Sequence, residues 1–229
     1  EGDFSVEVYP IAKNLEKDEA PGEIYEELKQ QSIAIHTLVN NAGLGQRGKF
    51  WEIPLEKDLT MIRVNLEAPV RLTKLFLPPM ITRGRGRILN TAAIAGFEPG
   101  PLMAIYHATK AFLLSFSESL ATELEGTKIS VTALCPGPVD TDFFPKADMV
   151  GTRVFQEGRV MAPQEVAKTA YDACVRGERY VVPGVANKAM VFSRRLMTEL
   201  AQAKTSERMY EAVKTRKREP GDIARKANA

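Results

Sequence analysis

The sequence of 229 residues is poor in the residue types on which several classes of protein depend. Its only cysteines are Cys135 and Cys174, which excludes a scaffold held by disulfides and favours a reducing compartment. It has two histidines, and no group of Cys, His and acidic residues has metal-ligand spacing, so we predict no metal site. No apolar run approaches the roughly 18 residues of a membrane span, which excludes an integral membrane protein.

Neither sign of charge dominates, since 31 Lys and Arg residues stand against 29 Asp and Glu residues. This balance gives no indication of a nucleic-acid partner, and we expect none. Residues 204–229 carry a basic excess, so we expect a basic C-terminal helix or tail after a domain over residues 1–203. No secretory signal with a basic start and an apolar core is recognisable, and we therefore expect a cytoplasmic protein.

Short apolar or β-branched runs alternate with longer helical patterns along the sequence. We expect strands over residues 5–11, 33–39, 87–91, 129–134 and 180–182. We expect helices over residues 21–31, 55–81, 106–125, 163–175 and 187–203, with Pro78 and Pro79 limiting the second of these. Strands buried on both faces and separated by helices predict βαβ units, and hence an α/β fold with a doubly wound parallel sheet.

Tyr106 and Lys110 are spaced i, i+4, so they project from the same face of one predicted helix. An ammonium beside a phenol stabilises the phenolate and lowers the tyrosine pKa from its ordinary value of about 10. Such a pair can move a proton to or from a carbonyl or alcohol oxygen. The spacing alone is common, and a packed tyrosine beside a solvent-facing lysine is the structural alternative.

Four further motifs accompany this pair in a fixed order. They are Asn40-Asn41-Ala42-Gly43, Arg63-Val64-Asn65, Gly86-Arg87-Ile88-Leu89-Asn90 followed by Ala95-Gly96, and Cys135-Pro136-Gly137-Pro138-Val139-Asp140-Thr141. With Tyr106 and Lys110 they resemble the short-chain dehydrogenase/reductase family in its single-domain form, from about residue 5 to residue 184. The resemblance implies a Rossmann-like domain whose substrate lies at the carboxyl ends of the strands.

The resemblance also implies a role for each matching residue. Tyr106 would be the proton donor in reduction, Lys110 would bind the nicotinamide ribose, and the main-chain carbonyl of Asn65 would hold a relay water. The residues that would contact the adenosine half of the nucleotide are Asn40, Ala42 and Gly43. Those that would flank the nicotinamide are Pro136, Gly137, Val139 and Thr141.

One departure from the family pattern concerns the substrate oxygen. The family has a serine thirteen residues before the tyrosine, whereas position 93 of this sequence is alanine. Loss of one such hydrogen-bond donor typically costs about 2.7–4 kcal/mol in the transition state, or 10²–10³ in rate. An engineered loss, a naturally degenerate site and a different chemistry all fit this departure. We expect Ala93 and Tyr106 to line the substrate.

Two other departures concern the nucleotide. The glycine-rich phosphate loop of the family is absent, and Gly43-Leu44-Gly45-Gln46-Arg47-Gly48 has only a superficially similar spacing after a later strand. By the family's order the sequence lacks the first two strands, and we expect that missing half to precede Glu1 in the whole protein. The alternative is a true truncation that folds differently or that pairs its open sheet edge with a partner. The aspartate that usually lies beside the adenine is matched by Asn14, which can still hydrogen-bond.

We therefore predict an NAD(P)-dependent oxidoreductase that reversibly reduces a carbonyl to an alcohol, with NADP favoured over NAD. Residues 93–100 and the Phe- and Met-containing residues 143–161 would wall a hydrophobic small-molecule substrate. The resemblance implies a homodimer or homotetramer. Two alternatives stay open: a catalytically impaired binding or scaffold protein of the same fold, and a hydrolase that uses the Tyr-Lys pair as an activated nucleophile or base.

Overall fold

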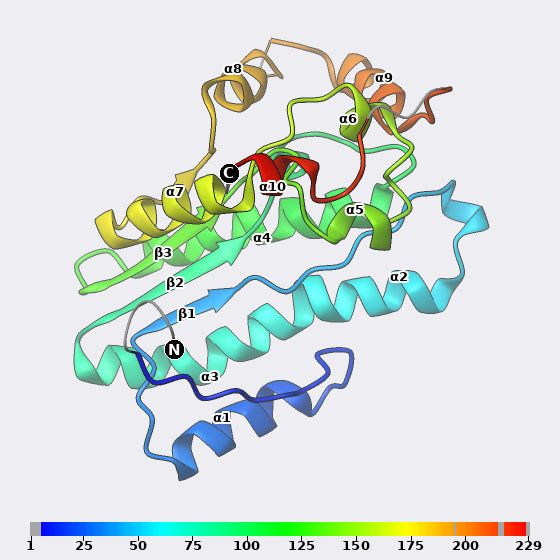
Figure 1. The fold of residues 1–229 in the computed structure, drawn as a ribbon. Helices are drawn as coiled ribbons and strands as arrows, with labels where there is room; N and C mark the ends of the chain where they lie inside the picture. Colours follow the sequence, from blue (N-terminus) through cyan, green and yellow to red (C-terminus); the bar gives the residue numbers. More distant parts are fainter. Residues whose placement is uncertain (1–5, 195, 215–217, 228–229) are drawn as a thin grey trace.

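The computed structural model describes residues 6–194, 196–214 and 218–227, and its strands form one parallel sheet (Figure 1). The strands are β1 (Thr37–Asn40), β2 (Gly86–Thr91), β3 (Ile129–Leu134) and β4 (Tyr180–Val181), which lie in the order β1-β2-β3-β4. The α-helices are α1 (Ala20–Gln30), α2 (Leu55–Ile62), α3 (Ala68–Arg83), α4 (Ala104–Glu123), α5 (Phe143–Lys146), α6 (Arg153–Gln156), α7 (Pro163–Arg176), α8 (Val185–Arg194), α9 (Glu199–Tyr210) and α10 (Asp222–Ala227). The shorter turns are the 3₁₀-helices η1 (Phe50–Glu52) and η3 (Ile94–Phe97) and the π-helix η2 (Arg63–Glu67).

Helices cover both faces of the sheet, with α3 and α4 on one face and α7 on the other (Figure 1). Side chains alternate along each strand, so each face has its own apolar core. On one face Ile88 and Val131 pack with Phe76 of α3. On the other face Leu89 and Leu134 pack with α7. The Rossmann-like, doubly wound α/β fold predicted from the sequence is confirmed.

The segment before the sheet differs from the prediction. Residues 6–11 form no strand, and Ser5 lies outside the described residues. Residues 6–11 run beside α1 and α3 (Figure 1). Helices offer no free backbone groups with which a strand could form a ladder of hydrogen bonds. The edge of β1 away from β2 pairs with no strand in the described part of the chain. Val39 on this strand is 52% exposed, whereas α7 packs mainly on β2, β3 and β4.

Two predicted helices have different limits in the structure. The helix expected over residues 55–81 contains the π-helical turn η2 and continues through Pro78 and Pro79 to Arg83. Packing of this helix on β2 offsets the hydrogen bonds that the prolines remove, and the helix ends at Gly84, which has a left-handed φ of 64°. The helix expected over residues 187–203 is two helices, α8 and α9, because Thr198 caps the second one with its side chain.

The C-terminal part packs against the rest of the structure. The boundary expected between residues 203 and 204 falls inside α9, and the proposed division there stays a prediction. Tyr210 belongs to an apolar cluster with Phe144, Met149 and Phe155, and Ile223 packs against this cluster. This cluster covers the carboxyl ends of the strands, where the sequence places the site.

Candidate active site

Asparagine side chains tie the ends of β1 and β2 to α4. Asn40 and Asn90 are neighbours in the sheet register, and Asn40 Nδ2 donates to Asn90 Oδ1 at 2.8 Å. Asn90 Nδ2 donates in turn to Ser117 Oγ at 2.9 Å, and both of these residues are fully buried. The sequence predicts Asn40 as a site residue but misses Asn90 and Ser117. An asparagine at the end of both strands is the signal that could have found Asn90.

Asn65 holds the loop that follows β1. It is fully buried in the π-helical turn η2, a local geometry that is frequent at functional sites. Its Oδ1 accepts from Leu44 N at 2.7 Å, and its Nδ2 donates to Leu44 O at 2.8 Å and to Thr109 Oγ1 at 3.1 Å. The side chain therefore joins the turn after β1 to α4. This contact is additional to the main-chain role that the resemblance implies.

Lys110 brings α4 to the same place. Its side chain is buried, and Nζ donates to the main-chain oxygen of Thr91 at 2.7 Å. A side chain at Gly43 would meet Lys110 Nζ at 3.4 Å and Asn65 Oδ1 at 3.6 Å, so these three predicted residues lie together. Burial disfavours the ammonium and lowers the pKa of Lys110 to about 8.

Tyr106 lies one helical turn before Lys110 on α4. Lys110 Nζ lies 5.7 Å from the centroid of the Tyr106 ring. Burial raises the pKa of the Tyr106 hydroxyl above its ordinary value. The sequence-based expectation of a lowered pKa is therefore wrong for this structure, because desolvation of the phenolate outweighs the neighbouring ammonium. The hydroxyl holds its proton at neutral pH.

Ala93 occupies the turn between β2 and α4. It is buried, has extended backbone and precedes η3. Ile94 N donates to Pro136 O at 2.9 Å, which joins this turn to the segment after β3. A side chain at Gly96 would lie 2.8 Å from the main-chain oxygen of Lys110, so glycine is needed for this approach. The methyl group of Ala93 adds no hydrogen-bond donor to the site.

The segment after β3 continues toward the same edge of the sheet. Val139 forms a parallel bridge with Met161, which extends the sheet locally beyond its regular strands. A side chain at Gly137 would meet Asn187 Oδ1 at 2.6 Å, so the backbone after β3 packs closely against the Asn187 side chain. Thr141 is exposed at the end of the segment. The four residues predicted to flank a nicotinamide thus follow β3 directly.

Phe143 covers this group of residues from the loop over 143–161. Its ring centroid lies 5.2 Å from that of Tyr106. A side chain at Gly45 would meet Phe143 Cζ at 2.5 Å, so the ring occupies the space beside the loop after β1. Arg47 N donates to Ala147 O at 3.1 Å, which joins the two loops. The sequence predicts Phe143 only as part of a wall, and its contact with Tyr106 emerges from the fold.

Two predicted cofactor residues make no such contact. Asn14 lies ahead of α1, where its Oδ1 accepts from Glu16 N at 3.0 Å. This segment and α1 lie on the side of α3 that faces away from the sheet (Figure 1). Ala42 is exposed in the turn between Asn40 and Gly43. The roles assigned to Asn14 and Ala42 stay predictions.

A buried polar cluster lies behind the helix face that carries Tyr106. His107 Nε2 lies 2.7 Å from Tyr210 Oη, and His107 Nδ1 lies 3.0 Å from the main-chain oxygen of Glu98. Arg194 pairs with Glu98 at 2.6 Å, yet burial raises the pKa of the Glu98 carboxyl to about 7. Burial also lowers the pKa of His107. The cluster joins α4 to α8 and α9, and we therefore interpret it as structural.

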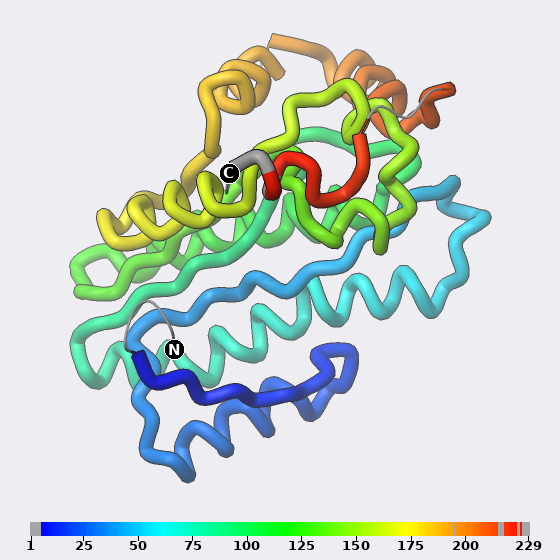
Figure 2. Tube along the Cα trace, viewed as in Figure 1, coloured from blue at the N-terminus to red at the C-terminus, as the bar shows by residue number. Residues whose placement is uncertain are grey.

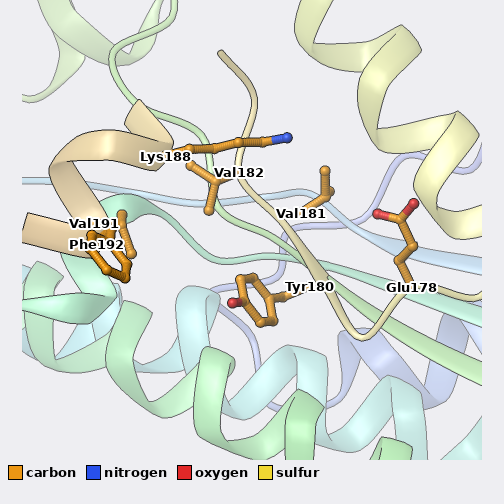
Figure 3. A pocket seen from close by; sticks show the side chains of 7 residues that line it. All are labelled: Glu178, Tyr180, Val181, Val182, Lys188, Val191 and Phe192. Atoms are coloured by element: carbon orange, nitrogen blue, oxygen red, sulfur yellow. The ribbon is translucent and has the colours of Figure 1, made fainter. Parts of the chain in front are cut away.

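A cavity of about 430 Å³ lies apart from these residues, beside β4 and α8 (Figure 3). Its lining residues are Glu178, Tyr180, Val181, Val182, Lys188, Val191 and Phe192. None of the residues predicted for the site is among them. Within the described ranges, no three His, Cys, Asp or Glu side chains gather as metal ligands. Nor does any helix among the described residues have the length and apolar character to cross a bilayer.

Comparison with known proteins adds a family and several relatives. The family model of short chain dehydrogenases matches residues 1–149. A short chain dehydrogenase of Pseudocercospora fijiensis is 32% identical over 145 residues, which cover 62% of this chain and 47% of that protein. The 3-oxoacyl-(acyl-carrier-protein) reductase FabG of Aquifex aeolicus is 30% identical over 182 residues, covering 78% of this chain and 73% of the reductase. The chain thus spans about half the length of the first of these relatives.

A solved structure extends the likeness to the fold. The short-chain dehydrogenase of Sphingobium yanoikuyae in complex with NADPH superposes with a TM-score of 0.69. It is 27% identical in sequence, and the match covers 88% of this chain and 76% of the other.

Proposed function

Because the chain belongs to the short-chain dehydrogenase family, we propose that it reversibly reduces a carbonyl compound to an alcohol with a nicotinamide dinucleotide. The observation that carries this proposal is the convergence of Tyr106, Lys110, Asn65 and Gly43 at the carboxyl ends of the strands. Parallel doubly wound sheets bind their ligands at this edge.

The residues present fit the nicotinamide half of a dinucleotide. An ammonium has three N–H donors, and Lys110 Nζ donates to Thr91 O, which leaves donors for ribose hydroxyls. The Oδ1 atom of Asn40, a residue assigned to the adenosine half, is buried without a partner among the described residues. When bound, the dinucleotide would supply the hydride that adds to the carbonyl carbon. Lys110 would hold its ribose, and Pro136, Gly137, Val139 and Thr141 would flank its ring.

The chain's own residues would supply the proton. The Tyr106 hydroxyl would donate its proton to the substrate oxygen as the oxygen gains charge, giving the alcohol and a phenolate. The raised pKa of Tyr106 keeps that proton on the hydroxyl at neutral pH before reaction. Lys110, whose pKa is about 8, is mostly an ammonium at pH 7 and would stabilise the phenolate that forms. Asn65 would hold the relay water at its main-chain carbonyl.

The walls of the site favour an apolar substrate. Phe143 lies against Tyr106, and the cluster behind it contains Met103, Phe144 and Met149, all buried. Such a wall offers burial rather than hydrogen bonds to the part of the substrate beyond the carbonyl. We therefore propose a hydrophobic ketone, aldehyde or acyl derivative. NADP is proposed ahead of NAD, since the Sphingobium structure is a complex with NADPH.

Dinucleotide binding tests this proposal directly. The purified protein, its N-terminus verified by mass spectrometry, is titrated with NADPH and with NADH, and binding is followed by the nucleotide's fluorescence. We expect micromolar affinity for at least one of the two. Absence of binding by either nucleotide would contradict the proposed oxidoreductase.

Ala93 favours a second candidate, a binding protein of the same fold without redox activity. The family's serine would place a donor on the substrate oxygen, and alanine has none. In that case the protein would bind the dinucleotide or a partner without turning over any carbonyl. Replacement of Ala93 by serine separates the two candidates. An oxidoreductase would reduce its carbonyl substrate faster, whereas a binding protein without redox activity would gain no rate.

A further inference from the structure

The C-terminal segment, of which residues 211–214 and 218–227 are described, lies along the loop over 143–161 that covers Tyr106 (Figure 2). Thr152 and Ala212 form an antiparallel bridge. Arg153 N donates to Glu211 O at 3.0 Å, and Val213 N donates to Gly151 O at 2.9 Å. These backbone bonds give residues 211–213 the character of a strand added to the loop over 143–161.

A second set of bonds fixes the same loop further along. Gln156 is buried, its Oε1 accepts from Arg218 N, and its Nε2 donates to Arg218 O, both at 2.8 Å. The Arg218 guanidinium donates to Phe155 O at 2.8 Å and to Gly158 O at 2.7 Å. Arg218 is therefore a structural residue of the loop and not part of a solvated basic face.

A third contact joins the segment to the residues proposed to flank the nicotinamide. Asp140 is buried between Val139 and Thr141 in the chain. Its Oδ1 accepts from Gly221 N at 2.7 Å, and its Oδ2 accepts from Ile223 N at 2.6 Å. Hydrogen bonds to an ionised carboxylate are short and about twice as strong as neutral ones. Asp140 thus anchors the start of α10.

The consequence of this anchor is the position of Ile223. Its side chain packs against the cluster that includes Phe144 and Met149. Tyr106 and Phe143 pack against the same cluster from the other elements. The C-terminal segment therefore adds a side chain to the apolar wall behind the proposed proton donor.

The loop depends on this support because its own helices are short. α5 and α6 have four residues each, far below the length at which a helix is stable by itself. Their shape is set by packing and by the bonds from residues 211–213 and 218–223. A change at the anchor or at Ile223 would therefore alter the apolar wall that Tyr106 and Phe143 border.

We infer that Ile223 is a specificity-determining residue of the substrate site and that Asp140 is the positioning residue that holds it there. This inference rests on the proposed function, and it deepens that function by assigning part of the substrate wall to the C-terminal segment. A smaller residue at 223 opens the wall to longer carbonyl compounds, and a larger one closes it.

The test compares a series of straight-chain methyl ketones of increasing length with NADPH as the reductant. The variants are Ile223→Ala, Ile223→Val and Ile223→Phe, with Glu219→Ala as a matched control on an exposed position of the same segment. One missing methylene in an apolar pocket changes discrimination about tenfold or more, so the ratio of kcat/KM for the longest to the shortest ketone should rise about tenfold in Ile223→Ala. It should rise less in Ile223→Val, fall in Ile223→Phe and stay unchanged in Glu219→Ala.

A double-mutant cycle tests the role of Asp140. Asp140→Asn keeps the size of the side chain and weakens its acceptance from the two backbone amides. If Asp140 acts through Ile223, Asp140→Asn and Ile223→Ala shift the ketone ratio non-additively when combined. Additive shifts would overturn the positioning role, whatever the stability of the variants.

The outcomes separate this inference from the proposed function. If the wild-type protein reduces ketones and all Ile223 variants keep its ratio, the specificity role is overturned and the proposed function stands. If the wild-type protein binds neither nucleotide and reduces no ketone, the proposed function fails and the inference falls with it. Unfolding midpoints of each variant show whether Ile223→Phe is folded, and Ile223→Ala and Ile223→Val decide the matter if it is not.

Discussion

Lys110 Nζ lies over the Tyr106 ring, 5.7 Å from its centroid, while it donates to the main-chain oxygen of Thr91 at 2.7 Å. The ammonium therefore bridges the end of β2 and the face of the phenol. Among the described residues the Tyr106 hydroxyl has no hydrogen-bond partner, so it is free to meet a ligand. We therefore expect changes at Tyr106 and at Lys110 to affect activity and stability to different extents.

Replacement of Tyr106 by phenylalanine removes the hydroxyl that would donate the proton. Among the described residues this hydroxyl makes no hydrogen bond, so its loss should not destabilise the fold. General acid catalysis is worth about 10²–10⁴ in rate, so kcat/KM for ketone reduction should fall by about that factor. The midpoint of urea unfolding should change little. Steady-state kinetics and urea titration measure the two effects.

The matched control is Tyr210→Phe, which removes the same atom from a buried tyrosine. Tyr210 Oη lies 2.7 Å from His107 Nε2, so its loss leaves a buried polar group unpaired and costs about 1–3 kcal/mol of stability. Tyr106→Phe should thus lose activity and keep its stability, whereas Tyr210→Phe should lose stability and keep its activity. A Tyr106→Phe variant with wild-type turnover would remove Tyr106 from the mechanism.

Lys110→Met should abolish most activity without lowering stability at pH 7. The folded-state pKa of Lys110 is about 8, below its ordinary value of 10.5, because burial disfavours the ammonium. Between these two values the unfolded state binds more protons than the folded state, so the wild type gains stability as pH rises. Below about pH 8 the buried ammonium lowers the free energy of unfolding of the wild type by the full cost of burying the charge. The neutral methionine side chain has no such cost.

The measurement is the free energy of unfolding of both proteins from pH 7 to pH 10.5. The difference in favour of Lys110→Met should be largest at pH 7 and shrink as pH rises. A difference between the two proteins that stays constant over this range would contradict the buried ammonium.

The rate of ketone reduction should also depend on Lys110. As pH rises through about 8, the side chain loses its proton and no longer stabilises the phenolate. The pH profile of kcat for reduction should therefore fall above about pH 8 in the wild type. Lys110→Arg keeps a charge that does not titrate there, and a fall of the same size in that variant would assign the effect to another group.

Ala93→Ser should increase turnover. A serine hydroxyl at this position would add a donor to the substrate oxygen, which is worth about 10²–10³ in kcat. Ala92→Ser is the control, since Ala92 packs in the cluster with Leu113 and Ala133 on the other side of the chain. An Ala93→Ser protein that binds NADPH and turns over no faster would favour the binding protein without redox activity.

The sequence predicts the sheet well where strands are buried on both faces. The apolar run over 129–134 is β3 with the same limits, because both helix layers cover it. The run over 33–39 is misjudged, since β1 begins only at Thr37 and includes Asn40. Composition does not distinguish residues 33–36, which precede the sheet, from residues that pair in it.

The site is predicted where a motif names the residue and missed where contact depends on the fold. Lys110, Asn65 and Gly43 lie together as the motifs indicate. The contact of Phe143 with Tyr106 arises from a loop whose path no local pattern specifies. The contact of Asp140 with Ile223 joins residues 83 positions apart, beyond the reach of any spacing rule.

The direction of the Tyr106 pKa shows the limit of reasoning from neighbours alone. The spacing of Tyr106 and Lys110 places a cation near the phenol, but it does not report the burial that opposes ionisation. The assembly as a homodimer or homotetramer, the compartment and the preference for NADP are likewise matters that local patterns do not determine. They stay predictions.

The central claim is hydride and proton addition to a carbonyl at Tyr106. The most direct measurement supplies NADPH deuterated at the reactive carbon of the nicotinamide together with a methyl ketone, and analyses the alcohol by mass spectrometry. The account predicts deuterium on the carbinol carbon with the wild-type protein, and a rate of labelling lower by about 10²–10⁴ with Tyr106→Phe. No labelled alcohol from a folded wild-type protein that binds NADPH, or equal labelling by both proteins, would contradict it.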